Sequence, residues 1–70
     1  SLLRDLAFGY ARTGREGLAA LTAAERLAAV GERRDARRLA GRAKGLLDAG
    51  SAAWLRADDI LASLPEETAD

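Results

Sequence analysis

The sequence predicts an all-α fold built from four antiparallel helices. Ala and Leu supply most of the apolar residues in a chain of 70 residues, whereas Val and Ile occur once each, and this composition favours helices over strands. Apolar residues recur at three- and four-residue spacings, as in helices with one buried face. Gly and Ser interrupt this pattern. The short linkers between segments predict that consecutive helices are antiparallel neighbours, in either a closed bundle or a solenoid of helical hairpins.

The first predicted helix stops at Thr13-Gly14, because Gly is the residue preferred for the left-handed turn after a helix. The second covers about residues 15–30 and stops at Gly31. It carries apolar residues on two sides, which predicts neighbours on two sides. The apolar stripe of the first helix is Leu3, Leu6, Ala7 and Tyr10; the two stripes of the second are Ala20, Ala23, Leu27 and Val30, and Leu18, Leu21, Ala24 and Ala28.

The third predicted helix, at about residues 33–48, has the clearest apolar pattern in the chain. The fourth follows Ser51, a suitable N-cap, and ends at Pro65. The four helices form one predicted domain at residues 1–64, and residues 65–70 are predicted to be an acidic, disordered tail. The stripe of the third helix is Ala36, Leu39, Ala40, Ala43, Leu46 and Leu47, and that of the fourth is Ala53, Trp54, Ala57, Ile60, Leu61 and Leu64.

The absence of Cys and His excludes several classes of chemistry. Without them the chain lacks the usual zinc, iron and copper ligands, thiol nucleophiles, disulfides and imidazole acid–base catalysis. We therefore expect no catalytic residue and no cofactor in this chain. No apolar run reaches the roughly 18–20 residues of a membrane span, and we recognise no signal peptide. The chain has no Met and begins within an apolar pattern, so we interpret it as a piece of a longer polypeptide.

The net charge of zero conceals two oppositely charged regions. Residues 33–44 carry six basic side chains and one Asp, whereas residues 58–70 carry five acids and no basic side chain. Arg34, Arg38 and Arg42 form a ridge on the third helix, away from its apolar stripe. Together with the flanking Arg37 and Lys44, this ridge is either a docking surface for an acidic protein or for phosphate groups, or a solvated helix face. A basic face without stacking aromatics does not favour nucleic acid as the partner.

The spacing of the glycines indicates a repeat. Gly14 and Gly31 end successive predicted helices seventeen residues apart, which is half of the 34-residue tetratricopeptide period. In phase with Gly31, one repeat covers residues 17–50, and Trp54 begins the next. The chain therefore resembles a fragment of a tetratricopeptide array, a right-handed solenoid of helical hairpins. The packing positions of this repeat are Ala23, Ala24, Leu27, Ala36, Ala40 and Ala43, followed by Ala57 and Leu61 in the next.

A narrower resemblance covers nearly the whole chain. Its most specific part is the stretch at residues 50–61, in which a Gly-Ser helix start precedes a Trp-Leu-Arg-Ala-Asp-Asp run. Together with residues 6–16, 23–26, 36–40 and 43–44, this stretch resembles the C-terminal repeat segment of bacterial cell-envelope zinc metallopeptidases of the β-barrel assembly-enhancing type. The resemblance implies an HExxH zinc site in an upstream catalytic domain and a location in the periplasm or cell envelope. It places no catalytic or zinc-binding residue in this chain.

In this repeat phase the candidate partner-binding surface is a small apolar groove with two acids. Its occupant is either a protein or peptide partner, or the next helix or the catalytic domain of the parent chain. The competing interpretation is a structural four-helix bundle that self-associates through Phe8, Leu18 or Leu55. The predicted groove residues are Leu18, Leu21, Glu25, Ala28, Ala29, Leu55, Asp59 and Ala62, and the predicted ridge residues are Arg34, Arg38 and Arg42.

Overall fold

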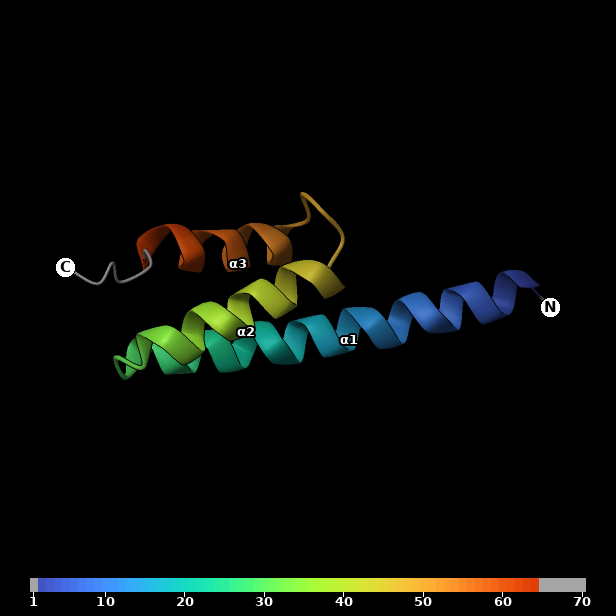
Figure 1. Cartoon of the computed structure of the whole chain (residues 1–70). Coiled ribbons are helices and arrows are strands. Elements are labelled where there is room, and N and C mark those ends of the chain that lie inside the picture. Colours follow the sequence, from blue (N-terminus) through green and yellow to red (C-terminus); the bar gives the residue numbers. More distant parts are fainter. Residues whose placement is uncertain (1, 65–70) are drawn as a thin grey trace.

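Three helices make up the part of the chain that the computed structural model describes, which is the backbone of residues 2–64 and the side chains of residues 12–64. They are α1 (Leu2–Ala29), α2 (Arg33–Leu46) and α3 (Ala52–Ser63), and these residues contain no strand. α2 runs back along the second half of α1, and α3 runs in the same direction as α1 (Figure 1). The predicted all-α fold is confirmed. The predicted acidic tail at residues 65–70 lies outside the described residues.

The number of helices differs from the prediction of four. The expected stop at Thr13-Gly14 is wrong, because α1 continues through it as one helix of 28 residues. Gly14 does not adopt a left-handed conformation; positive φ angles occur only at Gly31 and Gly50 among the glycines described. A glycine within a helix costs only about 1 kcal/mol relative to Ala, which is too little to end a helix with apolar residues on both sides of it.

The end of α1 is set by Gly31, as the sequence predicts. Gly31 has a φ of 84°, its N–H donates to the carbonyl oxygen of Ala28 at 3.2 Å, and the N–H of Glu32 donates to that of Leu27 at 2.8 Å. This pair of bonds is a Schellman motif, which satisfies carbonyls that the helix itself leaves without donors. The chain therefore reverses tightly and returns as α2.

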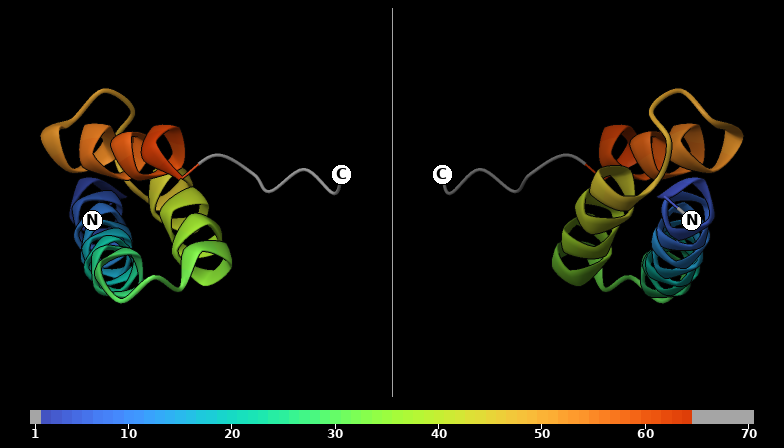
Figure 2. Two further views of the ribbon diagram at one scale, coloured as in Figure 1. Left: turned by 90° about the vertical axis from the view of Figure 1, so that its left-hand side faces the viewer. Right: turned by 90° about the vertical axis from the view of Figure 1, so that its right-hand side faces the viewer.

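The start of α3 also follows the prediction. Gly50 has a φ of 82° in a turn closed by the Ser51 N–H, which donates to the carbonyl oxygen of Asp48 at 3.0 Å. The Ser51 hydroxyl then accepts a hydrogen bond from the N–H of Trp54 at 3.2 Å. Ser51 is thus the N-cap of α3, and the turn places α3 over both α1 and α2 (Figure 2).

Small side chains form the core where the three helices meet. Leu21 is the only large side chain that is fully buried within the described part of the chain. Leu47, Ala53 and Ile60 pack against the core from its edge. The remaining buried apolar residues are Ala20, Ala24, Ala36, Ala40, Ala43 and Ala57.

Gly17 lets the end of α2 lie directly on α1. A Cβ atom at this position would lie 2.8 Å from Cγ and Cδ2 of Leu47 and 3.2 Å from Cβ of Leu46. Such separations are shorter than ordinary van der Waals contact, so even an Ala side chain requires its neighbours to move. The same residue type thus has different roles at Gly14 and Gly17, because nothing lies within 4 Å of a Cβ atom at Gly14.

Polar side chains from α2 hold α3 in place. Arg37 donates through Nη1 to the carbonyl oxygen of Leu61, at 2.9 Å, and to that of Leu64. These carbonyl oxygens lie at the C-terminal end of α3, where no backbone N–H of the helix can donate to them and the helix dipole favours a cation. Lys44 Nζ lies 2.8 Å from Oδ1 of Asp58 and 4.5 Å from the centre of a Trp54 ring.

We expect Ala substitutions at the two α1 glycines to change stability in opposite directions. Gly14→Ala should raise the free energy of unfolding by roughly 0.5–1 kcal/mol, because Ala favours the helix and meets no neighbour. Gly17→Ala should lower it by about 1 kcal/mol, because overpacking against Leu46 and Leu47 exceeds that gain. Urea unfolding followed by circular dichroism measures both. Equal stabilisation by the two substitutions would contradict the close approach at Gly17.

Candidate functional site

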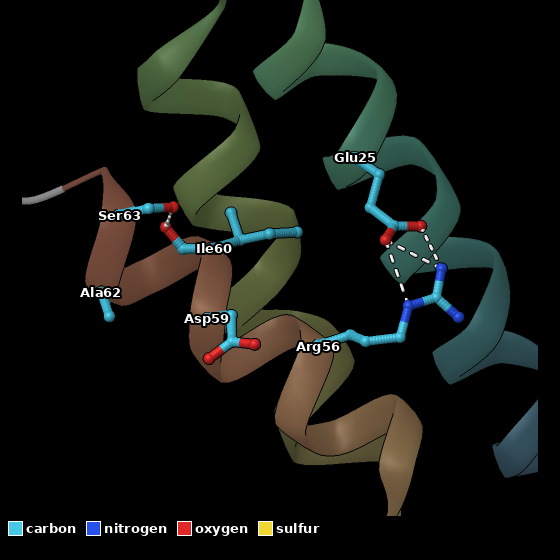
Figure 3. A pocket seen from close by; sticks show the side chains of 6 residues that line it. All are labelled: Glu25, Arg56, Asp59, Ile60, Ala62 and Ser63. Atoms are coloured by element: carbon cyan, nitrogen blue, oxygen red, sulfur yellow. Dashed lines mark hydrogen bonds and ion pairs between the residues drawn. The ribbon is translucent and has the colours of Figure 1, made fainter.

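A shallow groove lies between α1 and α3. Its volume is about 550 Å³, and one of its lining residues comes from α1 whereas the others come from α3. It is open to solvent along its length, and Figure 3 shows the side chains that line it. These are Glu25, Arg56, Asp59, Ile60, Ala62 and Ser63.

An ion pair joins the two helices across this groove. Nη2 of Arg56 lies 2.6 Å from Oε1 and 2.8 Å from Oε2 of Glu25, and Nε lies 3.2 Å from Oε2. The guanidinium group therefore binds both carboxylate oxygens, and these contacts orient the Arg56 side chain more closely than a single hydrogen bond does. The two side chains remain 57% and 38% exposed, so water screens the attraction.

Asp59 is the unpaired acid of the groove. It is exposed and makes no hydrogen bond or ion pair with any residue in the described part of the chain. Arg56 turns towards Glu25 (Figure 3). The neighbouring Asp58 is bound by Lys44. The apolar residues Ile60 and Ala62 lie beside this carboxylate in the groove. The site thus presents a free negative charge next to a small apolar surface.

The structure separates the residues that the sequence assigns to one groove. Glu25 and Asp59 line the groove between α1 and α3, whereas Leu18 lines a second hollow of about 200 Å³ near the start of α3. Leu55 is 49% exposed and lines neither hollow. Leu21, also predicted to line the groove, is instead 1% exposed and lies in the core. Of the other predicted groove residues, Ala62 lines the same groove as Asp59, Ala28 is half-buried and Ala29 is exposed.

The second hollow lies where the turn before α3 approaches α1. Leu18 is 48% exposed there, beside Leu47 and Ala53. The hollow contains one carboxylate residue, Asp48. Its remaining lining residues are Thr13, Gly14, Leu46 and Ser51.

The arginine ridge lies on the outer face of α2. Arg34, Arg38 and Arg42 are all exposed, as expected for residues opposite the buried alanines of this helix. The ridge is separate from the groove, since none of its members lines it. Only Arg38 has a partner among the described residues, the neighbouring Asp35 at 3.8 Å.

Three cations that position α3 are not distinguishable in the sequence from other surface residues. Arg37 and Lys44 flank the ridge in sequence but bind α3, and Arg56 binds Glu25, which lies 31 residues away in the chain. The sequence leaves Asp58 to pair with Arg56 or with a neighbouring segment, and in the structure its partner is Lys44 of α2. These partners can be identified only when the position of α3 on α1 and α2 is known.

Comparison of the chain with protein-family models, curated proteins and solved structures gave no match. No group of three or more His, Cys, Asp or Glu side chains within the described residues is arranged to hold a metal ion. None of the helices, as far as they are described, combines the length and hydropathy of a membrane-spanning helix. The functional assignment therefore depends on the geometry of the groove and of the ridge.

We expect the Glu25–Arg56 pair to contribute a small, salt-sensitive coupling energy. In a double-mutant cycle with Glu25→Gln and Arg56→Gln, the coupling should be roughly 0.5–1 kcal/mol at low ionic strength, because both groups are partly exposed. The coupling energy should fall towards zero in about 1 M salt, where the Debye length is roughly 3 Å. Urea unfolding of the four proteins measures this coupling. Its absence at low salt would show that the pair does not hold α3 to α1.

Proposed function

We propose that the chain is a noncatalytic protein-interaction segment whose groove between α1 and α3 binds a peptide of a partner protein. The observation that carries this proposal is the free carboxylate of Asp59 beside Ile60 and Ala62, in a groove whose other carboxylate, Glu25, is already paired. A peptide with a basic side chain next to an apolar one matches this pattern, because it offers Asp59 a counter-ion and covers the apolar surface.

We further propose that the chain belongs to the helical-repeat class, with one tetratricopeptide-like repeat at residues 17–50. The second half of α1 and α2 then form one hairpin, and α3 is the first helix of the next. Supporting this, Gly31 lies at the turn of the hairpin and α3 packs on both of its helices. In such arrays the first helices of successive hairpins face the ligand. In this chain those helices are α1 and α3.

Charge reversal at Asp59 tests the peptide-binding function. Asp59→Lys should weaken binding of a short Arg-Leu peptide series by about fivefold, as expected for loss of one exposed ion pair. Glu16→Lys is the matched control, because it makes the same change in net charge at an exposed position about two and a half turns before Glu25, on the opposite side of α1. Fluorescence anisotropy measures both. Equal weakening by the two variants would show nonspecific attraction instead of a site at the groove.

Self-association is the competing function, and two exposed side chains favour it. Leu18 and Leu55 are 48% and 49% exposed, whereas Phe8, the third residue considered for this role, lies outside the residues whose side chains are described. Sedimentation of the same samples separates the two functions. If the chain is a dimer and Leu55→Gln dissociates it, the exposed apolar surface binds a second copy of the chain. If the chain is a monomer, this surface remains available to a peptide.

For the parent protein we propose an envelope zinc metallopeptidase of which this chain is the C-terminal repeat segment. The support is the resemblance at residues 50–61, where Ser51 caps α3, Trp54 lies under Lys44 and Arg56 binds Glu25. Every one of these contacts is structural, so the segment itself would cover the catalytic domain or bind partners without taking part in hydrolysis.

The reading frame that encodes the chain tests this assignment. We expect the frame to continue upstream of Ser1 and to encode an HExxH sequence preceded by a signal peptide, because the zinc ligands cannot come from a chain without His. Sequencing the gene upstream of this segment provides the measurement. A signal peptide without HExxH would contradict the metallopeptidase assignment but leave the repeat class standing.

A further inference from the structure

The outer face of α2 carries arginines that the described fold does not use. Among the described residues, Arg34 and Arg42 have no ion-pair or hydrogen-bond partner, and Arg38 has only Asp35, at 3.8 Å. The side chains of that pair are 68% and 54% exposed, so water screens it strongly. Because these arginines are spaced by four residues, they rise along the helix in steps of about 6 Å. They form a row of accessible guanidinium groups.

Two glycines lie on the same face. Gly41 and Gly45 are each seven residues after a member of the row, Arg34 and Arg38 respectively, and seven residues return a helix almost to the same direction. Both glycines are exposed, and nothing lies within 4 Å of a Cβ atom at either position. Glycine disfavours a helix relative to Ala, and no contact within the described fold requires its small size here. Bare backbone is therefore accessible beside the arginines.

We propose that this Arg–Gly face, formed by Arg34, Arg38, Gly41, Arg42 and Gly45, binds an acidic α-helix of a partner protein. Carboxylates spaced by four on the partner have the same rise of about 6 Å as the arginine row. Each guanidinium can then bind a carboxylate through two hydrogen bonds. Over Gly41 and Gly45 the partner backbone approaches closely if its own contact residues are small, because interaxial distance depends on the side chains between two helices.

The same features argue against a nucleic acid. The N–H groups of Gly41 and Gly45 lie within α2, where they donate to the helix itself and are not available to a phosphate. The face has no aromatic side chain on which a base stacks. The net charge of zero also reduces the long-range attraction of a polyanion. A protein helix matches both the charges and the bare backbone.

This inference rests on the proposed function only in treating the chain as an interaction segment, since it uses α2 and not the groove between α1 and α3. The probe is a synthetic helical peptide with Glu at every fourth position and Ala beside it on the same face. A peptide of identical composition in shuffled order is its control. We expect the ordered peptide to bind about tenfold more tightly in fluorescence anisotropy at low salt.

Variants of the chain separate the contributions of charge and close approach. Arg38→Glu should weaken binding of the ordered peptide by about tenfold or more. Gly41→Ala and Gly45→Ala should each raise the urea midpoint yet weaken binding by about tenfold, because the added methyl groups separate the two helices. Gly14→Ala is the matched control: we expect a higher urea midpoint with unchanged binding. Asp59→Lys should also leave this binding unchanged, which separates failure of this face from failure of the groove.

Three outcomes would overturn the proposal. One is equal binding of the ordered and shuffled peptides. Another is unchanged affinity in both Gly41→Ala and Gly45→Ala, which would reduce the face to a nonspecific basic patch. The third is binding of duplex DNA at least as tight as that of the ordered peptide and equally sensitive to Arg38→Glu, which would assign the arginines to a nucleic acid.

Discussion

The close approach of three helices over alanine and glycine surfaces is the constraint on which the rest of the structure depends. Alanine side chains are short, so they exclude water from one another only when the helix axes lie close together. Ala40, Ala43 and Ala57 are completely buried, and Gly17 has no space for even a methyl group beside Leu47. A larger side chain at one of these positions would separate helices that other residues also hold together.

An alanine core has an energetic consequence. Hydrophobic stabilisation increases with the apolar area removed from water, and each alanine contributes little of it. Ala57 is the one fully buried residue of α3 within the described range. The position of α3 therefore also depends on the partly buried Ala53 and Ile60 and on polar contacts at the edge of the core, made by Arg37, Lys44 and Arg56. The groove is formed by α1 and α3 together, so its shape depends on the same contacts.

Local signals in the sequence predict the local features of the fold. The end of α1 at Gly31, the cap of α3 at Ser51 and the buried face of α2 follow from short-range patterns, and the structure confirms all three. The predicted helix stop at Gly14 is wrong for a physical reason. A glycine favours a left-handed turn and is also tolerated within a helix, and only its φ angle separates the two cases.

The candidate site is less accessible to prediction, because it depends on how the helices lie together. The second half of α1 is apolar on two sides, so its pattern does not show that Leu21 faces the core while Leu18 remains half exposed. Arg56 reaches Glu25 across 31 residues, and no spacing rule joins them. The exposure of Arg34, Arg38 and Arg42 is easier to predict, since it follows from the helical period of α2 alone.

The way in which α3 is attached also gives this small fold two levels of stability. α1 and α2 supply all the buried alanines described except Ala57, whereas α3 adds the partly buried Ala53 and Ile60 and partly exposed ion pairs at its edges. Local opening of α3 therefore needs less free energy than separation of α1 from α2, and the molecule can open as a flap on an intact hairpin. Amide protons of α3 then exchange with solvent before those of α2. A ligand bound between α1 and α3, as proposed, would favour the closed position of α3, so binding at the groove and opening of the last helix would be coupled equilibria.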